Sequence, residues 1–141
     1  MDAIVVGTDG SPGAEAAVRK VIELARGSGA TVHLVCAYPG RSALERIGMS
    51  ARQDPVDLRG VAADVLARDT RRLKEAGFAV ETYAREGDAA HTIIDVAAEN
   101  DADLIVIGAH GNTGLRLFML GSVAGKLAHH APTSLLIVRE D

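Results

Sequence analysis

The sequence predicts an α/β protein with an open parallel sheet and helices on both faces. Short apolar runs alternate with segments of helical periodicity along all 141 residues. Hydrophobic residues make up 48% of the chain and aromatic residues only 3%, so the core must consist of Val, Ile, Leu and Ala. That composition is typical of a buried parallel sheet. The length fits one domain, and we expect residues 1–141 to share a single core.

The pattern of apolar residues gives the order of the expected elements. In chain order they are a strand over 3–7, a helix over 14–26, a strand over 31–37, a helix over 56–75, a strand over 78–84, a helix that follows Asp88, a strand over 103–108, a helix over 121–130 and a strand over 134–138. Strands that alternate with helices in this way are joined by right-handed crossovers and pair in parallel.

Local signals support several of these boundaries. Ser11 and Pro12 supply an N-cap and an N1 proline for the first helix. Gly77 follows the second helix at the position of a C′ glycine, and Asp88 caps the next helix. The stretch 41–55 keeps no period, and we expect a loop with one short helical turn there.

The charge and cysteine content of the chain indicate which binding partners and which cellular compartment to expect. Lys and Arg total 15 against 19 Asp and Glu, a net charge of −4 without a basic block, so we expect no nucleic-acid partner. There is no run of roughly 18 apolar residues and no signal-type segment, so we expect a cytoplasmic protein without a membrane partner. Cys36 is the only cysteine and lies in an apolar strand, which predicts a small core residue without a disulfide.

Two glycines and a third at a fixed spacing mark a candidate anion site near the C-terminus. Gly108 and Gly111 follow the apolar run 104–107, and after nine intervening residues Gly121-Ser122 opens the last helix. Glycines let backbone N–H groups approach a ligand closely, and the start of a helix presents unpaired N–H groups at its positive end. This arrangement predicts a phosphate cradle.

A second unusual segment follows the first strand. Residues 7–11 read Gly-Thr-Asp-Gly-Ser, and 108–111 read Gly-Ala-His-Gly after the fourth strand. Open parallel sheets bind ligands outside the carboxyl ends of strands, where the strand order reverses. If these two strands are neighbours at the reversal, both loops face one crevice and one ligand can touch both.

These paired segments resemble those of the universal stress protein family, specifically its ATP-binding branch. The resemblance rests on Val5 to Ser11, on Leu104 to Gly111 and on Gly121-Ser122-Val123, and it spans the whole chain in length and element order. It implies a Rossmann-like, five-stranded sheet in the order 3-2-1-4-5, an adenine nucleotide in the crevice, and a homodimer.

The resemblance also implies which residues meet the nucleotide. They are Gly7, Thr8, Asp9, Ala37, Ile107, Gly108, Gly111, Gly121, Ser122 and Val123. In the implied arrangement Thr8 and Ala37 flank the adenine, Asp9 meets the ribose or a magnesium ion near the phosphates, Ile107 and Gly108 line the pocket, and Gly111 with 121–123 holds the phosphates. Ala124 is a departure, because some members carry a hydroxyl there, which implies weaker binding of a triphosphate.

Other uses of these residues stay open on sequence alone. Gly108 and Gly111 could simply end a strand and shape a turn, and Asp9 could cap its own turn through an Asx-type bond. The Ser122 hydroxyl can serve as an N-cap, as a phosphate ligand, or as both. His110 lies between glycines on a loop and is more typical of a surface residue than of a catalytic base.

Two known nucleotide motifs are absent. The segment from Gly121 to Lys126 has three residues between its glycines and no Ser or Thr after the lysine, so it is not a Walker A loop. No G-x-G-x-x-G follows the first strand. Lys126 and Arg116 could still reach a phosphate. A phosphorylated receiver domain is disfavoured, because the third strand ends in Ala84-Arg85-Glu86 instead of an acceptor aspartate.

We therefore expect a regulatory binder of ATP, ADP or AMP, with magnesium carried by the nucleotide and slow or no hydrolysis. Asp9 is the one evident acidic candidate at the site, and hydrolysis would need more groups than that. The strand from Ser134 to Val138 is almost wholly apolar at an implied sheet edge, which predicts a homodimer through antiparallel pairing of this strand. The alternative is a structural dimer of the same fold that binds no nucleotide.

Overall fold

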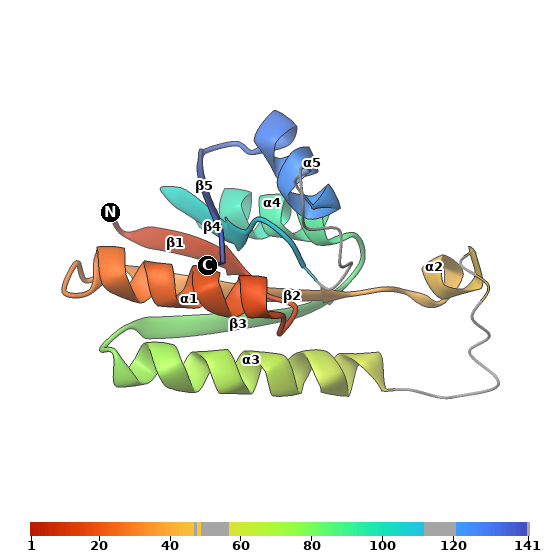
Figure 1. Cartoon of the computed structure of the whole chain (residues 1–141), viewed down its shortest axis with the longest axis horizontal. Coiled ribbons are helices and arrows are strands. Elements are labelled where there is room, and N and C mark those ends of the chain that lie inside the picture. The colour runs from red at the N-terminus through yellow and green to blue at the C-terminus, as the bar shows by residue number, and fades with distance from the viewer. Residues whose placement is uncertain (47, 49–56, 112–120, 141) are drawn as a thin grey trace.

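The computed structural model describes residues 1–46, 48, 57–111 and 121–140 (Figure 1). Its elements are β1 (Ala3–Gly7), α1 (Pro12–Ala25), β2 (Thr31–Tyr38), α2 (Arg41–Arg46), α3 (Leu58–Glu75), β3 (Ala79–Glu86), α4 (Ala89–Glu99), β4 (Leu104–Gly108), α5 (Ser122–His130) and β5 (Ser134–Val138). The predicted order of strands and helices is confirmed. The short helix α2 occupies the start of the stretch that lacked periodicity, and most of the rest of that stretch lies outside the described residues.

The five strands form one parallel sheet in the order β3-β2-β1-β4-β5. The predicted order 3-2-1-4-5 is therefore correct. The chain moves outward from β1 through β2 to β3 and then returns to the other side of β1 with β4. The reversal falls between β1 and β4, where Val5 pairs with Ile105 and Val6 with Val106. The carboxyl ends of these two strands lie side by side.

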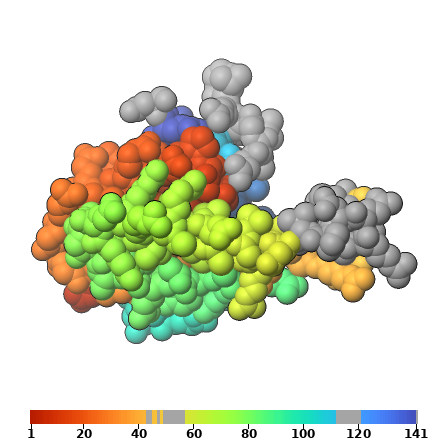
Figure 2. All heavy atoms as spheres, turned by 90° about the horizontal axis from the view of Figure 1, so that it is seen from below, coloured from red at the N-terminus to blue at the C-terminus, as the bar shows by residue number. Residues whose placement is uncertain are grey.

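Alternation along the strands divides the core into two layers. Ile4 and Val6 of β1 belong to the apolar cluster that contains residues of α1 and α3, whereas Val5 belongs to the cluster that contains residues of α4 and α5. Helices α1 and α3 therefore cover one face of the sheet, and α4 and α5 cover the other (Figure 1). Figure 2 shows the face covered by α3, with α1 beside it.

The predicted caps are present. The Ser11 hydroxyl accepts a hydrogen bond from the N–H of Ala14 at 3.2 Å, and a carboxylate oxygen of Asp88 accepts one from the N–H of His91 at 3.0 Å. Gly77 has a φ of 97°, as a C′ glycine requires. The second long helix begins at Leu58, because Asp57 caps it through the N–H of Gly60. No helix in the described part of the chain is long and apolar enough to span a bilayer.

Candidate functional site

A pocket of about 210 Å³ opens at the carboxyl ends of β1 and β4, where the strand order reverses. Its lining comprises Gly7, Thr8, Asp9, Ser11, Ala14, Val35, Ala37, Ala89, Ile93, Ile107, Gly108, Ala109, His110, Gly111, Gly121, Ser122, Val123 and Ala124. All ten residues that the sequence singled out are in this lining. The structure therefore brings the segment after β1 and the segment after β4 to one site.

Asp9 lies on the loop between β1 and α1 with its side chain exposed. One carboxylate oxygen, Oδ1, accepts a hydrogen bond from the N–H of Ser11 at 3.0 Å, so the Asx-type turn left open by the sequence is formed. The other oxygen, Oδ2, faces the second glycine loop: a Cβ added to Gly111 would lie 2.6 Å from it. Any side chain at position 111 would push Asp9 away. Close approach to Asp9 is thus a local reason for glycine at this position.

Thr8 lines the pocket, but its hydroxyl is engaged on the other side of the loop. The hydroxyl donates to Oδ2 of Asp69 on α3 at 2.7 Å and accepts from the N–H of Gly10 at 3.2 Å. The backbone N–H of Thr8 donates to the carbonyl of Val35 at 2.8 Å, which continues the sheet by one residue. The predicted contact of Thr8 with a base would therefore be made by its backbone and carbon atoms.

The first glycine of the cradle is required by the fold as well. A Cβ on Gly108 would lie 2.6 Å from the carbonyl carbon and oxygen of Gly13, in the first turn of α1. A Cβ on Gly13 would in turn clash with the carbonyl oxygen of His110. The backbones of α1 and of the segment after β4 are thus in direct contact, beside the pocket that Gly108 lines.

Helix α5 begins at the pocket without a side-chain cap. Gly121 is its N-cap residue, and Ser122, for which the sequence left capping open, is the first helical residue. The N–H of Gly121 donates to the carbonyl of Ala109 at 2.8 Å, which joins this helix start to the loop after β4. The first turn therefore presents N–H groups that no side chain of the helix start satisfies.

Three helix N-termini meet at this pocket. Ser11 and Ala14 come from the start of α1, Ala89 from the start of α4, and Ser122 from the start of α5. Each helix carries partial positive charge at this end, and negative groups are stabilised there. The Ser11 and Asp88 side chains cap α1 and α4. The start of α5 is therefore the end best suited to an external anion.

Apolar residues form another part of the pocket wall. Residues Ala14, Val35, Ala37, Ala89, Ile93 and Ile107 contribute to it. Ile93 and Ile107 are buried in the cluster under α4 and α5, so this wall belongs to the rigid core. A ligand with a flat apolar part and an anionic part would match these apolar residues and the start of α5.

Lys126 is paired within the protein. Its ammonium lies 3.1 Å from Oδ1 of Asp88, the residue that caps α4. The backbone N–H of His91 and then the Lys126 ammonium hold the pKa of the Asp88 carboxyl below its ordinary value. The predicted reach of Lys126 to a phosphate would thus require it to leave Asp88. Arg116, the other predicted candidate, lies outside the described residues.

Cys36 lies immediately behind the pocket, between the lining residues Val35 and Ala37 on β2. It points into the cluster under α1 and α3 and is 5% exposed. Burial, and then the negative charges of Asp9 and Asp69, raise the pKa of its thiol to about 11. The prediction of a small core residue is confirmed, and the thiol stays protonated at neutral pH.

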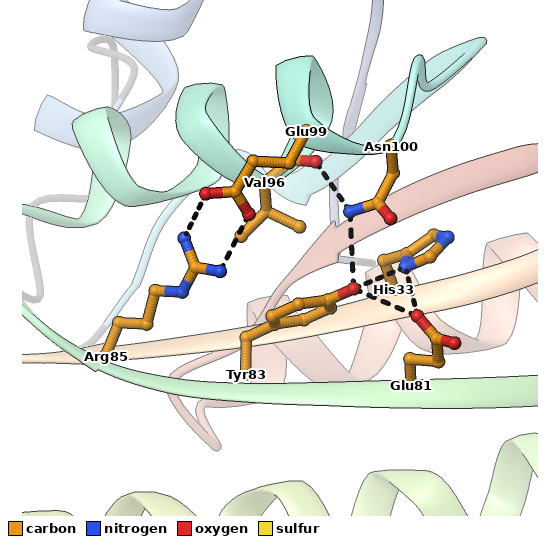
Figure 3. Close-up of polar contacts among 7 residues, drawn as sticks. All are labelled: His33, Glu81, Tyr83, Arg85, Val96, Glu99 and Asn100. Carbon is orange, nitrogen blue, oxygen red and sulfur yellow. Dashed lines mark hydrogen bonds and ion pairs between the residues drawn. The ribbon is translucent and has the colours of Figure 1, made fainter.

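A polar clamp holds α4, whose first turn lines the pocket, against the edge strand β3 (Figure 3). The Arg85 guanidinium donates to both carboxylate oxygens of Glu99, at 3.0 and 2.7 Å. The Tyr83 hydroxyl accepts from Asn100 at 3.2 Å, donates to Glu81 at 3.1 Å, and lies 2.9 Å from Nδ1 of His33. These contacts cross from β2 and β3 to the end of α4 and fix the helix far from its pocket end.

Sequence reasoning missed Asp69 and much of the apolar wall. The spacing Ala62, Leu66, Asp69, Leu73 is the buried stripe of α3, and a carboxylate on such a stripe is the signal that could have drawn attention to it. Ala89 and Ile93 carry no comparable signal, because alanine and isoleucine on a helix normally belong to the core. Within the described ranges, no three His, Cys, Asp or Glu side chains are grouped as metal ligands.

Fold and site together define a small α/β protein with a doubly wound parallel sheet and a ligand pocket at its switch point. The chain belongs to the universal stress protein family, whose sequence profile matches residues 1–139. A universal stress protein of Methanocaldococcus jannaschii is 28% identical, over 97% of this chain and 81% of that protein. One of Mycobacterium tuberculosis is 29% identical, over 96% and 94%. Other relatives align over about half their length, as in Bacillus subtilis.

Solved structures of the family share this fold and include nucleotide complexes. A universal stress protein in complex with cAMP is 29% identical and superposes with a TM-score of 0.70, covering 98% of this chain and 96% of its own. The Archaeoglobus fulgidus protein in complex with dAMP is 26% identical, with a TM-score of 0.74 and 98% coverage of both chains. Both ligands combine an adenine base with a phosphate.

Proposed function

We propose that this protein binds an adenine nucleotide in the pocket between β1 and β4. The uncapped start of α5, which lies in the same pocket as an apolar wall, is the observation that carries the proposal. The adenine would lie against the wall formed around Ala37 and Ile107, and the phosphates would lie at Gly111, Gly121 and Ser122. The complexes of family members with cAMP and dAMP support this ligand class.

Within that class we propose ATP as a ligand, with ADP and AMP as alternatives. The cradle leaves room for phosphate because Gly111 and Gly121 lack side chains, and a Cβ on Gly121 would already lie 3.1 Å from the carbonyl of Ala109. Asp9, at the edge of the same cradle, would hold a magnesium ion that arrives with the nucleotide. Ala124 lines the pocket without a hydroxyl, which favours shorter phosphate chains.

We further propose that the site binds nucleotide without rapid turnover. Phosphoryl transfer to water needs a group that orients the attacking water and positive charge at the transferred phosphate. Asp9 is the only carboxylate among the described lining residues, and Lys126 is paired with Asp88. A regulatory role, in which bound nucleotide changes the affinity for a partner protein, fits such a site. Turnover far above the background rate that is lost on Asp9→Ala would contradict this proposal.

The test is calorimetric titration of nucleotide-free protein with ATP and with AMP, each with and without magnesium. Ser122→Asp places a negative charge at the start of α5, where it favours the helix but repels a phosphate. We expect wild-type protein to bind one nucleotide per chain and Ser122→Asp to remain folded with at least about tenfold weaker binding.

Ser28→Asp is the matched control, because Ser28 is exposed at the other end of the sheet, just before β2. It should bind like the wild type. If wild-type protein freed of nucleotide binds neither ATP nor AMP, the cradle serves only the fold. The structural dimer that binds nothing would then be the better description.

A further inference from the structure

We propose that Asp69 is a positioning residue for the pocket, acting through Thr8 from the opposite side of the loop between β1 and α1. This inference rests on the proposed nucleotide site and adds a residue that touches no ligand. Asp69 lies on α3 and is fully buried, and its Oδ2 accepts the Thr8 hydroxyl at 2.7 Å. Thr8 itself lines the pocket.

Stability alone gives no reason for a carboxylate at position 69. The position lies on the apolar stripe of α3 between Leu66 and Leu73, both buried. Its second oxygen, Oδ1, accepts no hydrogen bond in the described part of the structure, and Arg68 Nε lies 3.7 Å away. A buried carboxylate with an oxygen that accepts no hydrogen bond is unfavourable, and apolar residues often replace buried ionic groups without loss of stability. The interaction with Thr8 is therefore the distinctive contribution of Asp69.

The chemistry of the pair sets the direction of the Thr8 hydroxyl. The Thr8 hydroxyl has one proton, which it donates to Oδ2 of Asp69. The lone pairs of the hydroxyl are then left for the N–H of Gly10, which donates at 3.2 Å. This second bond spans Asp9, so it helps to fix the backbone that presents Asp9 to the pocket.

The residue next to Asp69 holds the same loop. Nη2 of Arg68 donates to the carbonyl of Gly10 at 3.2 Å and lies 3.5 Å from a carboxylate oxygen of Glu15 on α1. Gly10 has a φ of 78°, and a Cβ on it would lie 3.1 Å from Val65 of α3. Two consecutive residues of α3, Arg68 and Asp69, thus bind the loop through Gly10 and Thr8 respectively. The helix lies on the face of the sheet opposite α4 and α5 (Figure 1), so the support comes from outside the pocket.

The test is titration with AMP of wild-type protein, Asp69→Leu and Asp69→Asn, with unfolding by denaturant measured in parallel. We expect Asp69→Leu to fold at least as stably as the wild type but to bind AMP about tenfold more weakly, since the loop loses one buried hydrogen bond. Asp69→Asn keeps an acceptor oxygen at the same place and should restore most of the affinity. A purely structural role would change the unfolding curve and leave the affinity unchanged.

Two control variants separate affinity from stability. Leu73→Ala opens a cavity one turn further along α3 and should lower stability with no change in AMP affinity. Thr70→Val removes a buried hydroxyl that has no hydrogen-bond partner among the described residues, so it should change neither. Thr8→Val should weaken AMP binding as much as Asp69→Leu, and the double variant should be no weaker than either.

The outcomes distinguish the two proposals. If wild-type protein does not bind AMP, the proposed function fails at that step. If the wild type binds and Asp69→Leu binds equally well, the positioning role is overturned while the nucleotide site stands. If Asp69→Leu does not fold, the AMP affinity of Thr8→Val is compared with that of the Thr70→Val control instead. An unchanged affinity in Thr8→Val overturns the inference.

Discussion

Gly108 at the end of β4 and Gly13 in the first turn of α1 are in backbone contact: a Cβ on Gly108 would lie 2.6 Å from the carbonyl carbon and oxygen of Gly13. The contact joins the end of β4, which leads into the glycine loop, with the start of α1, which follows the loop that carries Asp9. The two backbones can approach this closely only because both residues lack side chains.

Gly108→Ala should therefore destabilise the protein by about 2–3 kcal/mol, because backbone cannot yield as a flexible side chain can. Denaturant unfolding of the two proteins measures the difference. The matched control is Gly125→Ala in α5, where an added Cβ would meet no atom of the described residues within 4 Å. It should stabilise the protein by about 0.5–1 kcal/mol, through helix propensity. Equal effects at the two positions would refute the steric argument.

Asp88 links the starts of α4 and α5, since it caps α4 and pairs with Lys126. Its folded pKa lies below the ordinary 3.8. The stabilisation is therefore fully present above about pH 4 and is lost as the pH falls through the folded pKa. Asp88→Ala should cost about 1 kcal/mol at neutral pH through the lost cap. Its deficit relative to the wild type should shrink in acid.

Asp88→Ser separates the two contacts, because serine can cap the helix but cannot pair with Lys126. It should retain most of the stability at neutral pH. A loss as large as that of Asp88→Ala would mean that the ion pair, and not the cap, carries the effect. Thermal unfolding followed by circular dichroism between about pH 3 and pH 7 tests both variants against the wild type.

The elements and their order were predictable because each depends on a local or periodic signal. A short apolar run such as 104–107 was enough to predict a buried strand. Ser11 and Asp88 are typical N-cap residues, and in the structure both side chains accept the capping hydrogen bond. Strand ends were less certain: β3 continues to Glu86, two residues past the prediction, because it pairs with β2 as far as Tyr38. Pairing of that kind depends on a neighbouring strand and leaves no mark in the local sequence.

The glycine segments of the pocket were predictable, and the second layer behind them was not. Glycine spacing and the resemblance to a family pointed to residues 7–9 and 108–111, which the fold does bring together. The bond between Thr8 and Asp69 joins residues 61 positions apart. It depends on how α3 packs beside the first loop. Likewise, the sequence offered Lys126 as a phosphate ligand but could not reveal that Asp88 lies within 3.1 Å of it.

Cys36 gives a prediction at alkaline pH. The pKa of its thiol is raised from 9.0 to about 11, so the folded state holds this proton more tightly than the unfolded chain. The associated stability is fully present below about pH 9 and is lost as the pH rises toward the folded pKa. The stability difference between the wild type and Cys36→Ala should fall by about 1 kcal/mol between about pH 8 and pH 10. Denaturant unfolding at the two pH values measures it, and a constant difference would contradict the burial of the thiol.

The proposed homodimer depends on β5, an edge strand of the sheet from Ser134 to Val138. Its outer side offers backbone groups to a second copy, and no charged side chain interrupts the strand. Leu136→Lys places a charge in the middle of this edge, and we expect it to shift the protein to the monomer. Leu24→Lys is the matched control, because Leu24 is 62% exposed on α1. This variant should leave the dimer intact.

Light scattering at tens of micromolar distinguishes monomer from dimer, with circular dichroism to verify that both variants fold. A wild-type protein that is already monomeric at this concentration would rule out pairing through β5, whereas a dimer that survives Leu136→Lys would place the interface on another surface of the sheet or its helices.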